Sequence, residues 1–78
     1  MEYDKDKVDE LTLALLFLGM SRMKEGGRAW RGFDQQTLAR LHQRGWIGDP
    51  MEKGTSIGVS AEGMKKAAEF FKKHFQSP

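Results

Sequence analysis

Four polar side chains on one predicted helix have the types and the spacing that read base edges in DNA. The helix covers residues 34–44, and these residues on or beside its polar face are Gln36, Arg40, Gln43 and Arg44. Arg makes bidentate hydrogen bonds to guanine, and Gln makes them to adenine. Arg31 before the helix and Lys53 in the following hairpin would contact phosphates. The pattern predicts a nucleic-acid-binding face, although Gln and Arg are also good helix formers and ordinary surface residues.

The chain offers little for catalysis or metal binding. It has no cysteine, which excludes a disulfide framework and a thiolate metal site. Its two histidines, His42 and His74, lie on different predicted helices and have no serine or acid pair at a telling spacing. The glycine-containing segments lack a phosphate-loop pattern. We therefore expect a non-enzymatic protein with no metal, cofactor or small-molecule substrate, in which His42 is partly buried and has a hydrogen-bonding role.

The helix that carries the four polar residues has both of its ends encoded locally. Asp34 suits the N-cap, where its carboxylate accepts from backbone N–H groups of the first turn. Gly45 suits the left-handed position after the last turn, and Trp46 would then pack on Leu41 as in a Schellman ending. We therefore expect one short, complete helix from Asp34 to Arg44.

A longer first helix, from Tyr3 to about Arg22, is apolar on both of its sides. One side carries Val8, Leu11, Leu15 and Leu18, and the other carries Leu13, Leu16, Phe17 and Met20. A helix that is apolar all round must be buried all round. Either the rest of the chain covers both sides, or a second copy of the protein covers one. For the second alternative we expect a self-association surface formed by Leu13, Leu16, Phe17, Met20 and, on the last helix, Phe70.

The remaining elements predict a small α+β domain in the order helix, short strand, helix, β-hairpin, helix. The strand covers residues 28–32, the hairpin pairs residues 46–47 with 56–59, and a helix capped by Ser60 follows. Its apolar positions recur at helical spacing at Met64, Ala67, Ala68, Phe71 and Phe75. Trp30, Trp46, Phe71 and Phe75 are expected in the core. We expect one domain over residues 1–78, with frayed ends at 1–3 and 76–78 and a mobile loop at 50–56.

The net charge of +2 is unevenly distributed along the chain. Residues 1–10 carry five acidic and two basic side chains, whereas residues 11–78 carry eleven basic and six acidic ones. Clustered positive charge attracts nucleic acid or an acidic partner, but it is also found on ordinary solvated surfaces. No secretory signal and no apolar run long enough to span a bilayer is present, so we expect a cytoplasmic protein that does not bind membranes.

The motifs resemble two kinds of known protein. The latter half of the chain resembles that of winged-helix domains. It has a helix ending in Leu41-x-x-x-Gly45-Trp46-Ile47, then a hairpin, then a helix that opens with Val59-Ser60-Ala61-Glu62-Gly63. The whole chain resembles a family of small uncharacterised bacterial proteins, through Asp4-Lys5-Asp6-Lys7-Val8, Arg28-Ala29-Trp30-Arg31-Gly32-Phe33-Asp34 and the 38–50 segment. The winged-helix likeness implies DNA binding, but a DNA-binding winged helix has two helices between its first strand and its wing, and this chain has room for only one there. Either the first helix breaks near Gly19 to supply the second, or the chain is a reduced winged-helix-like fold.

Two functions are therefore predicted. The first is a protein-interaction or self-associating module that acts through the first helix, the last helix, or both. The alternative is a DNA-binding winged-helix protein that uses the 34–44 helix and the 47–59 hairpin.

Overall fold

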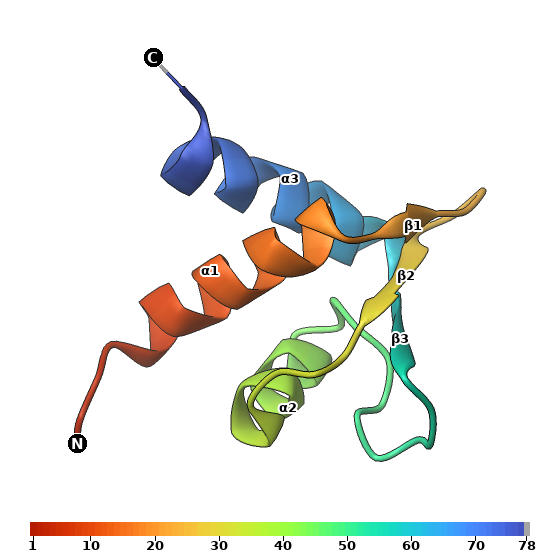
Figure 1. Cartoon of the computed structure of the whole chain (residues 1–78), viewed down its shortest axis with the longest axis horizontal. Helices are drawn as coiled ribbons and strands as arrows, with labels where there is room; N and C mark the ends of the chain where they lie inside the picture. Colours follow the sequence, from red (N-terminus) through yellow and green to blue (C-terminus); the bar gives the residue numbers. More distant parts are fainter. Residues whose placement is uncertain (78) are drawn as a thin grey trace.

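The computed structural model describes residues 1–77, which contain three helices and three short strands (Figure 1). In chain order they are α1 (Lys5–Leu18), β1 (Ser21–Arg22), β2 (Gly27–Trp30), α2 (Gln35–Gln43), β3 (Ser56–Val59) and α3 (Ala61–Phe75). The strands form one antiparallel sheet in the order β1-β2-β3. This is the α+β fold expected from the sequence. Among the described residues, no helix is both long and apolar enough to cross a membrane.

The ends of α2 and α3 are as predicted, because residues next to each end determine them. The Asp34 carboxylate accepts from the Thr37 backbone N–H at 3.0 Å, and the Ser60 hydroxyl accepts from that of Gly63 at 2.9 Å. Gly45 has a φ of 77°, and the N–H groups of Gly45 and Trp46 donate to the carbonyls of His42 and Leu41. These two bonds are the Schellman ending that Gly45 predicts.

The first helix is shorter than predicted, and an unpredicted strand follows it. Helix α1 begins after its N-cap Asp4 and ends at Leu18, so the prediction that it reaches Arg22 is wrong. Ser21 and Arg22 instead pair with Arg28 and Gly27 across a tight turn. Gly26 closes this turn with a φ of 89°, and its carbonyl accepts from the Met23 N–H at 3.0 Å. A two-residue strand is too short to leave a hydrophobic pattern in the sequence.

The predicted hairpin is present in part. Its first arm is reduced to a single bridge between Ile47 and Val59, supported by hydrogen bonds from Gly48 N–H to the Gly58 carbonyl and from Ser60 N–H to the Trp46 carbonyl. The main partner of β3 is β2, which precedes α2 in the chain. The sheet therefore depends on the pairing of β2 with β3, two strands that α2 separates in the sequence, and local turn signals do not encode this pairing.

Helix α1 lies between α3 and α2, as Figure 1 shows. The core that the three helices and the sheet enclose consists of Leu13, Leu16, Ala29, Leu38, Leu41, Trp46, Ile47, Ile57, Val59 and Ala67. Along β2, Gly27 and Ala29 are buried whereas Arg28 and Trp30 are exposed. Phe75 on α3 is 45% exposed, so the prediction that it lies in the core is wrong. The same prediction is wrong for Trp30, which is 64% exposed. The strand alternation places it on the face of the sheet opposite the core.

The chain ends have little structure. Residues 1–4 precede α1 and are exposed, and residues 76–77 follow α3. The third residue of the predicted C-terminal frayed segment, Pro78, lies outside the described residues.

Candidate interaction surfaces

One side of α1 presents an uncovered row of apolar side chains. Leu11, Leu15 and Leu18 follow one another at intervals of four and three residues, which places them on one side of a helix. Leu15 is 43% exposed and Leu18 is 69% exposed, while Leu11 is half-buried. Val8, one turn earlier, is also half-buried. We call these four residues the α1 stripe.

The residues predicted for self-association do not belong to the α1 stripe: Leu13, Leu16 and Phe17 lie on the other side of α1, Met20 follows the helix, and Phe70 lies on α3. Leu13 and Leu16 are fully buried in the core of the single chain, so they have no surface left for a second copy. Phe17, Met20 and Phe70 are half-buried and pack against that core. The sequence identified both apolar sides, but which side stays uncovered depends on where α2 and α3 pack. That placement is set by distant parts of the chain.

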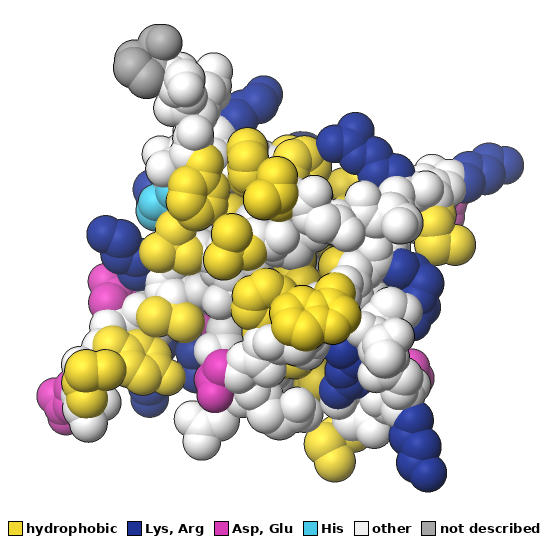
Figure 2. Space-filling model, in the orientation of Figure 1, with side chains coloured by type: hydrophobic (Ala, Val, Ile, Leu, Met, Phe, Trp, Pro, Cys, Tyr) yellow, Lys and Arg dark blue, Asp and Glu magenta, His cyan; other side chains and the backbone are white. Residues whose placement is uncertain are grey.

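Aromatic side chains extend the apolar surface from α1 onto α3. The ring centroids of Phe17 and Phe71 lie 5.6 Å apart, and those of Phe71 and Phe75 lie 5.5 Å apart. The Arg22 guanidinium lies over the Phe17 ring, 5.1 Å from its centroid. Figure 2 shows apolar side chains gathered over the two helices and Lys and Arg side chains around the sheet end of the molecule.

Arg40, the centre of the predicted DNA-binding face, is held by an ion pair inside the fold. Its Nε donates to both carboxylate oxygens of Asp9, at 2.9 and 3.0 Å, and its Nη2 donates to the Thr37 hydroxyl at 3.1 Å. Asp9 is only 2% exposed. The hydrogen bond to Asp9 raises the pKa of Arg40, which keeps the guanidinium charged. The sequence spacing placed Arg40 correctly on its helix but could not identify its partner on α1.

The other predicted nucleic-acid contacts divide into tethered and exposed residues. The Arg44 guanidinium lies 5.1 Å from the Trp46 ring centroid and 3.5 Å from an Asp6 oxygen. Arg31 donates to the backbone carbonyls of Pro50 and Glu52, which ties the 50–56 loop to the chain before α2. Gln36, Gln43 and Lys53 are exposed. The structure thus uses Arg31, Arg40 and Arg44 for contacts within the chain.

A second ionic cluster, which the sequence did not reveal, joins α1 to α3. Glu10 Oε1 lies 2.8 Å from His74 Nε2 and 2.9 Å from Lys73 Nζ. The hydrogen bonds from His74 and Lys73 lower the pKa of Glu10 below its ordinary value of 4.5. The other histidine, His42, has its Nδ1 3.1 Å from the Ile47 carbonyl, in agreement with the predicted hydrogen-bonding role, but the residue is exposed and not partly buried as predicted. Within residues 1–77, no group of three or more acidic or histidine side chains could hold a metal ion.

The lowered pKa of Glu10 predicts a loss of stability in acid. The folded protein binds the Glu10 proton more weakly than the unfolded chain does. Its contribution is therefore complete above pH 4.5 and is lost as the pH falls through the lowered folded pKa. We expect the difference in free energy of unfolding between the wild type and Glu10→Gln to be constant above about pH 5 and to shrink between about pH 5 and about pH 3. Urea unfolding across this range measures it, with Glu52→Gln as the exposed control. A difference that stays constant with pH would contradict the assignment.

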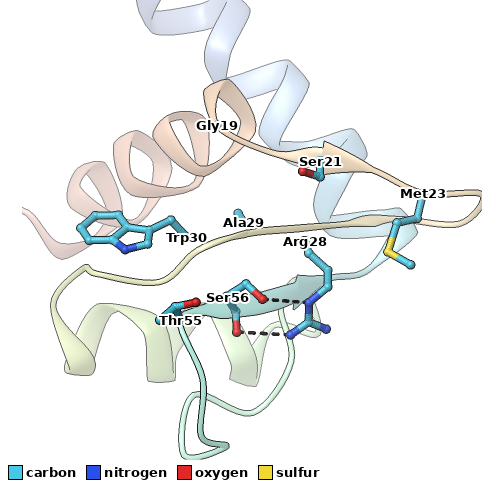
Figure 3. Close-up of a pocket in the computed structure, with 8 residues that line it drawn as sticks. All are labelled: Gly19, Ser21, Met23, Arg28, Ala29, Trp30, Thr55 and Ser56. Carbon is cyan, nitrogen blue, oxygen red and sulfur yellow. Dashed lines mark hydrogen bonds between the residues drawn. The ribbon is translucent and has the colours of Figure 1, made fainter.

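An open groove lies where β2 extends beyond β1 (Figure 3). It has a volume of 410 Å³ and is lined by Gly19, Ser21, Met23, Arg28, Ala29, Trp30, Thr55 and Ser56. Figure 3 shows Trp30 and Arg28 on the same strand, with Arg28 hydrogen-bonded to Ser56 on the neighbouring strand. The sequence does not predict this groove, because the groove depends on the unpredicted strand β1.

Comparison with known proteins identifies relatives without assigning an activity. Residues 4–77 match a family described as "Domain of unknown function (DUF6429)". "Uncharacterized protein y4hR" of Sinorhizobium fredii (strain NBRC 101917 / NGR234) is 43% identical over 75 residues, which cover 96% of this chain and 97% of that protein. No solved structure matches the chain.

Proposed function

Because the chain belongs to this family of unknown function, we propose its role from its surface: it is a non-enzymatic cytoplasmic module that self-associates through the α1 stripe. The observation that carries this proposal is the exposure of Leu15 and Leu18 on one side of a helix whose other side lies in the core. Fully burying an exposed Leu stabilises a complex by about 1.5–3 kcal/mol. In a symmetric dimer each residue contributes twice.

The spacing of the stripe favours a second copy of this chain as the occupant. Positions 8, 11, 15 and 18 have intervals of three, four and three residues, which read the same in both directions. A two-fold axis midway along the stripe would therefore place Val8 opposite Leu18 of the second copy, and Leu11 opposite its Leu15. An interface of this kind, in which one patch meets itself, is the usual arrangement in homodimers.

The charges at the two ends of α1 favour the same antiparallel pairing. Asp4 and Asp6 lie at the N-terminal end of α1, and Arg22 follows its C-terminal end. The two-fold axis would place the acidic N-terminal end of α1 in each copy next to Arg22 of the other copy. Opposite charges at the rim orient a complex more than they strengthen it. A parallel pairing would instead bring like charges together.

Leu18→Glu tests the proposal because Leu18 is the most exposed residue of the stripe. We expect the wild type to sediment as a monomer–dimer mixture that shifts toward dimer as its concentration rises. Leu18→Glu should weaken dimerisation at least about tenfold, since a charge would have to be buried against an apolar surface. Sedimentation equilibrium over a concentration series measures both constants. At a concentration low enough for both proteins to be monomeric, the thermal unfolding curves should differ little, because Leu18 is 69% exposed and makes a small contribution to the core.

Gln43→Glu is the matched control, because it adds the same charge at an exposed helical position on α2. It should dimerise like the wild type. A wild type that stays monomeric at all concentrations, or a Leu18→Glu variant that dimerises as the wild type does, would overturn the proposal.

The alternative, duplex DNA binding by a winged-helix-like domain through the 34–44 helix and the 47–59 hairpin, has weaker support. Arg40 would have to leave a buried carboxylate to reach a base. Gln36 and Gln43 remain exposed on that face for base contacts, Arg44 is exposed but contacts Asp6 and Trp46, and Lys53 is exposed for a phosphate contact. For this reason we place self-association first.

A further inference from the structure

The outer face of the sheet, opposite the core, is smooth and carries two large side chains. Arg28 and Trp30 of β2 project there, and their partners in the register on β3 are Gly58 and Ser56. Small residues opposite a large pair leave a shallow surface next to the groove. Gly19, Ser21 and Thr55 complete its walls, and Met23 is the one long aliphatic side chain among the lining residues.

The Trp30 indole is held in place although it is 64% exposed. Its ring lies 5.8 Å from that of Phe33, at an interplanar angle of 63°. It also packs against Gly32, where an added Cβ would lie only 2.7 Å from the indole Cε2 and closer still to two other ring carbons. Only a glycine at this position leaves room for the ring. Trp30 therefore presents an aromatic surface to solvent, with Gly32 and Phe33 as its neighbours.

Arg28 lies two residues from Trp30 on the same strand, and part of its guanidinium is available. Its side chain extends toward β3, whereas the Trp30 ring points away from it (Figure 3). Its Nε donates to the Ser56 hydroxyl at 3.0 Å, and its Nη2 donates to the Ser56 carbonyl at 3.2 Å (Figure 3). Its third nitrogen, Nη1, takes part in neither bond and remains a candidate donor to a ligand. A guanidinium held by two hydrogen bonds loses little side-chain freedom when it binds a phosphate.

The charge around the groove is positive. Segments 21–31 and 51–56 carry Arg22, Lys24, Arg28, Arg31 and Lys53 against Glu25 and Glu52. No acidic side chain lines the groove itself. Figure 2 shows Lys and Arg side chains around this end of the molecule. This surface favours an anionic ligand that also presents flat rings.

We propose that this groove binds single-stranded nucleic acid, with one base stacked on Trp30 and an adjacent phosphate bound by Arg28 Nη1. An aromatic platform within a basic groove is how proteins bind single strands without reading sequence. Stacking on Trp30 requires an unpaired base, which a duplex does not offer. The lining contains too few aliphatic side chains to recognise an apolar peptide. The proposal does not depend on dimerisation, because none of these residues belongs to the α1 stripe.

The test is fluorescence anisotropy of a labelled 12-nucleotide oligothymidylate titrated with the full chain at low salt. We expect saturable binding that weakens steeply as salt rises. Trp30→Ala should bind about tenfold more weakly, through loss of one stacked base, and Trp30→Phe should retain most of the affinity. Arg28→Gln should reduce the slope of log affinity against log salt by about one phosphate contact.

Two control variants separate this site from general electrostatics and from the dimer. Lys65→Gln removes one positive charge from the exposed surface of α3 and should not lower the affinity as Trp30→Ala does. Leu18→Glu should bind the oligonucleotide as the wild type does even if it no longer dimerises. Circular dichroism verifies that each variant is folded.

Four outcomes would overturn the proposal. They are no saturable binding at low salt, equal affinity of Trp30→Ala and the wild type, equal competition by duplex DNA, and equal competition by polyglutamate. The third would move the ligand to duplex DNA, and the fourth would indicate an acidic protein partner.

Discussion

Replacing Arg40 with Ala is expected to lower the free energy of unfolding of the domain by about 3 kcal/mol. This loss reflects a contact within the chain and says nothing about contacts with another molecule. The substitution would remove both Arg40 Nε hydrogen bonds from the Asp9 carboxylate, which is only 2% exposed in the folded protein. Removing one partner of a buried ion pair is far more costly than removing a surface charge, because the remaining charge stays desolvated. A domain of this size has little stability to lose, since small domains bury a smaller fraction of the surface of the unfolded chain than large domains do.

Urea unfolding followed by circular dichroism measures this effect. Gln36→Ala on the exposed face of α2 is the matched control and should change the free energy of unfolding by less than about 0.5 kcal/mol. A double variant, Asp9→Leu with Arg40→Met, should recover much of the lost stability because it buries no charge. If Arg40→Ala unfolds at the same urea concentration as the wild type, the Arg40–Asp9 ion pair does not stabilise the fold.

Local signals in the sequence predicted the features that neighbouring residues determine. Asp34, Gly45 and Ser60 each form the cap that was expected of them, because a cap is built from hydrogen bonds between residues two to five positions apart. The element types and the α+β class were predicted for the same reason.

The interaction surfaces could not be predicted in the same way, because their exposure depends on contacts between distant residues. Arg40 and Asp9 are 31 positions apart, so the helix pattern made Arg40 resemble a surface residue. The two apolar sides of α1 look equivalent in the sequence, and only the packing of α2 and α3 leaves Leu15 and Leu18 exposed. Trp30 was assigned to the core because of its size, whereas the register of β2 with β3 turns it outward.

Gly63→Ala is expected to destabilise the protein by at least about 2 kcal/mol, although Gly63 lies in a helix. In an exposed helix, replacing Gly with Ala raises stability by about 1 kcal/mol. Here the first turn of α3 lies against the backbone of Trp46. An added Cβ would clash with the Trp46 carbonyl and would lie 2.7 Å from its carbon and 2.9 Å from Cα. A backbone neighbour cannot rotate away as a side chain can.

The clash would also separate two elements that meet at this point. The Trp46 carbonyl accepts from the Ser60 N–H at 3.0 Å, and the Ser60 hydroxyl caps α3, so moving the helix away would weaken the junction between α3 and the segment after α2. Gly19→Ala is the control, because a Cβ there meets no atom within 4 Å. Thermal and urea unfolding of the two variants should therefore differ widely, with Gly19→Ala close to the wild type. If Gly63→Ala were as stable as the wild type, α3 would not pack this closely against Trp46.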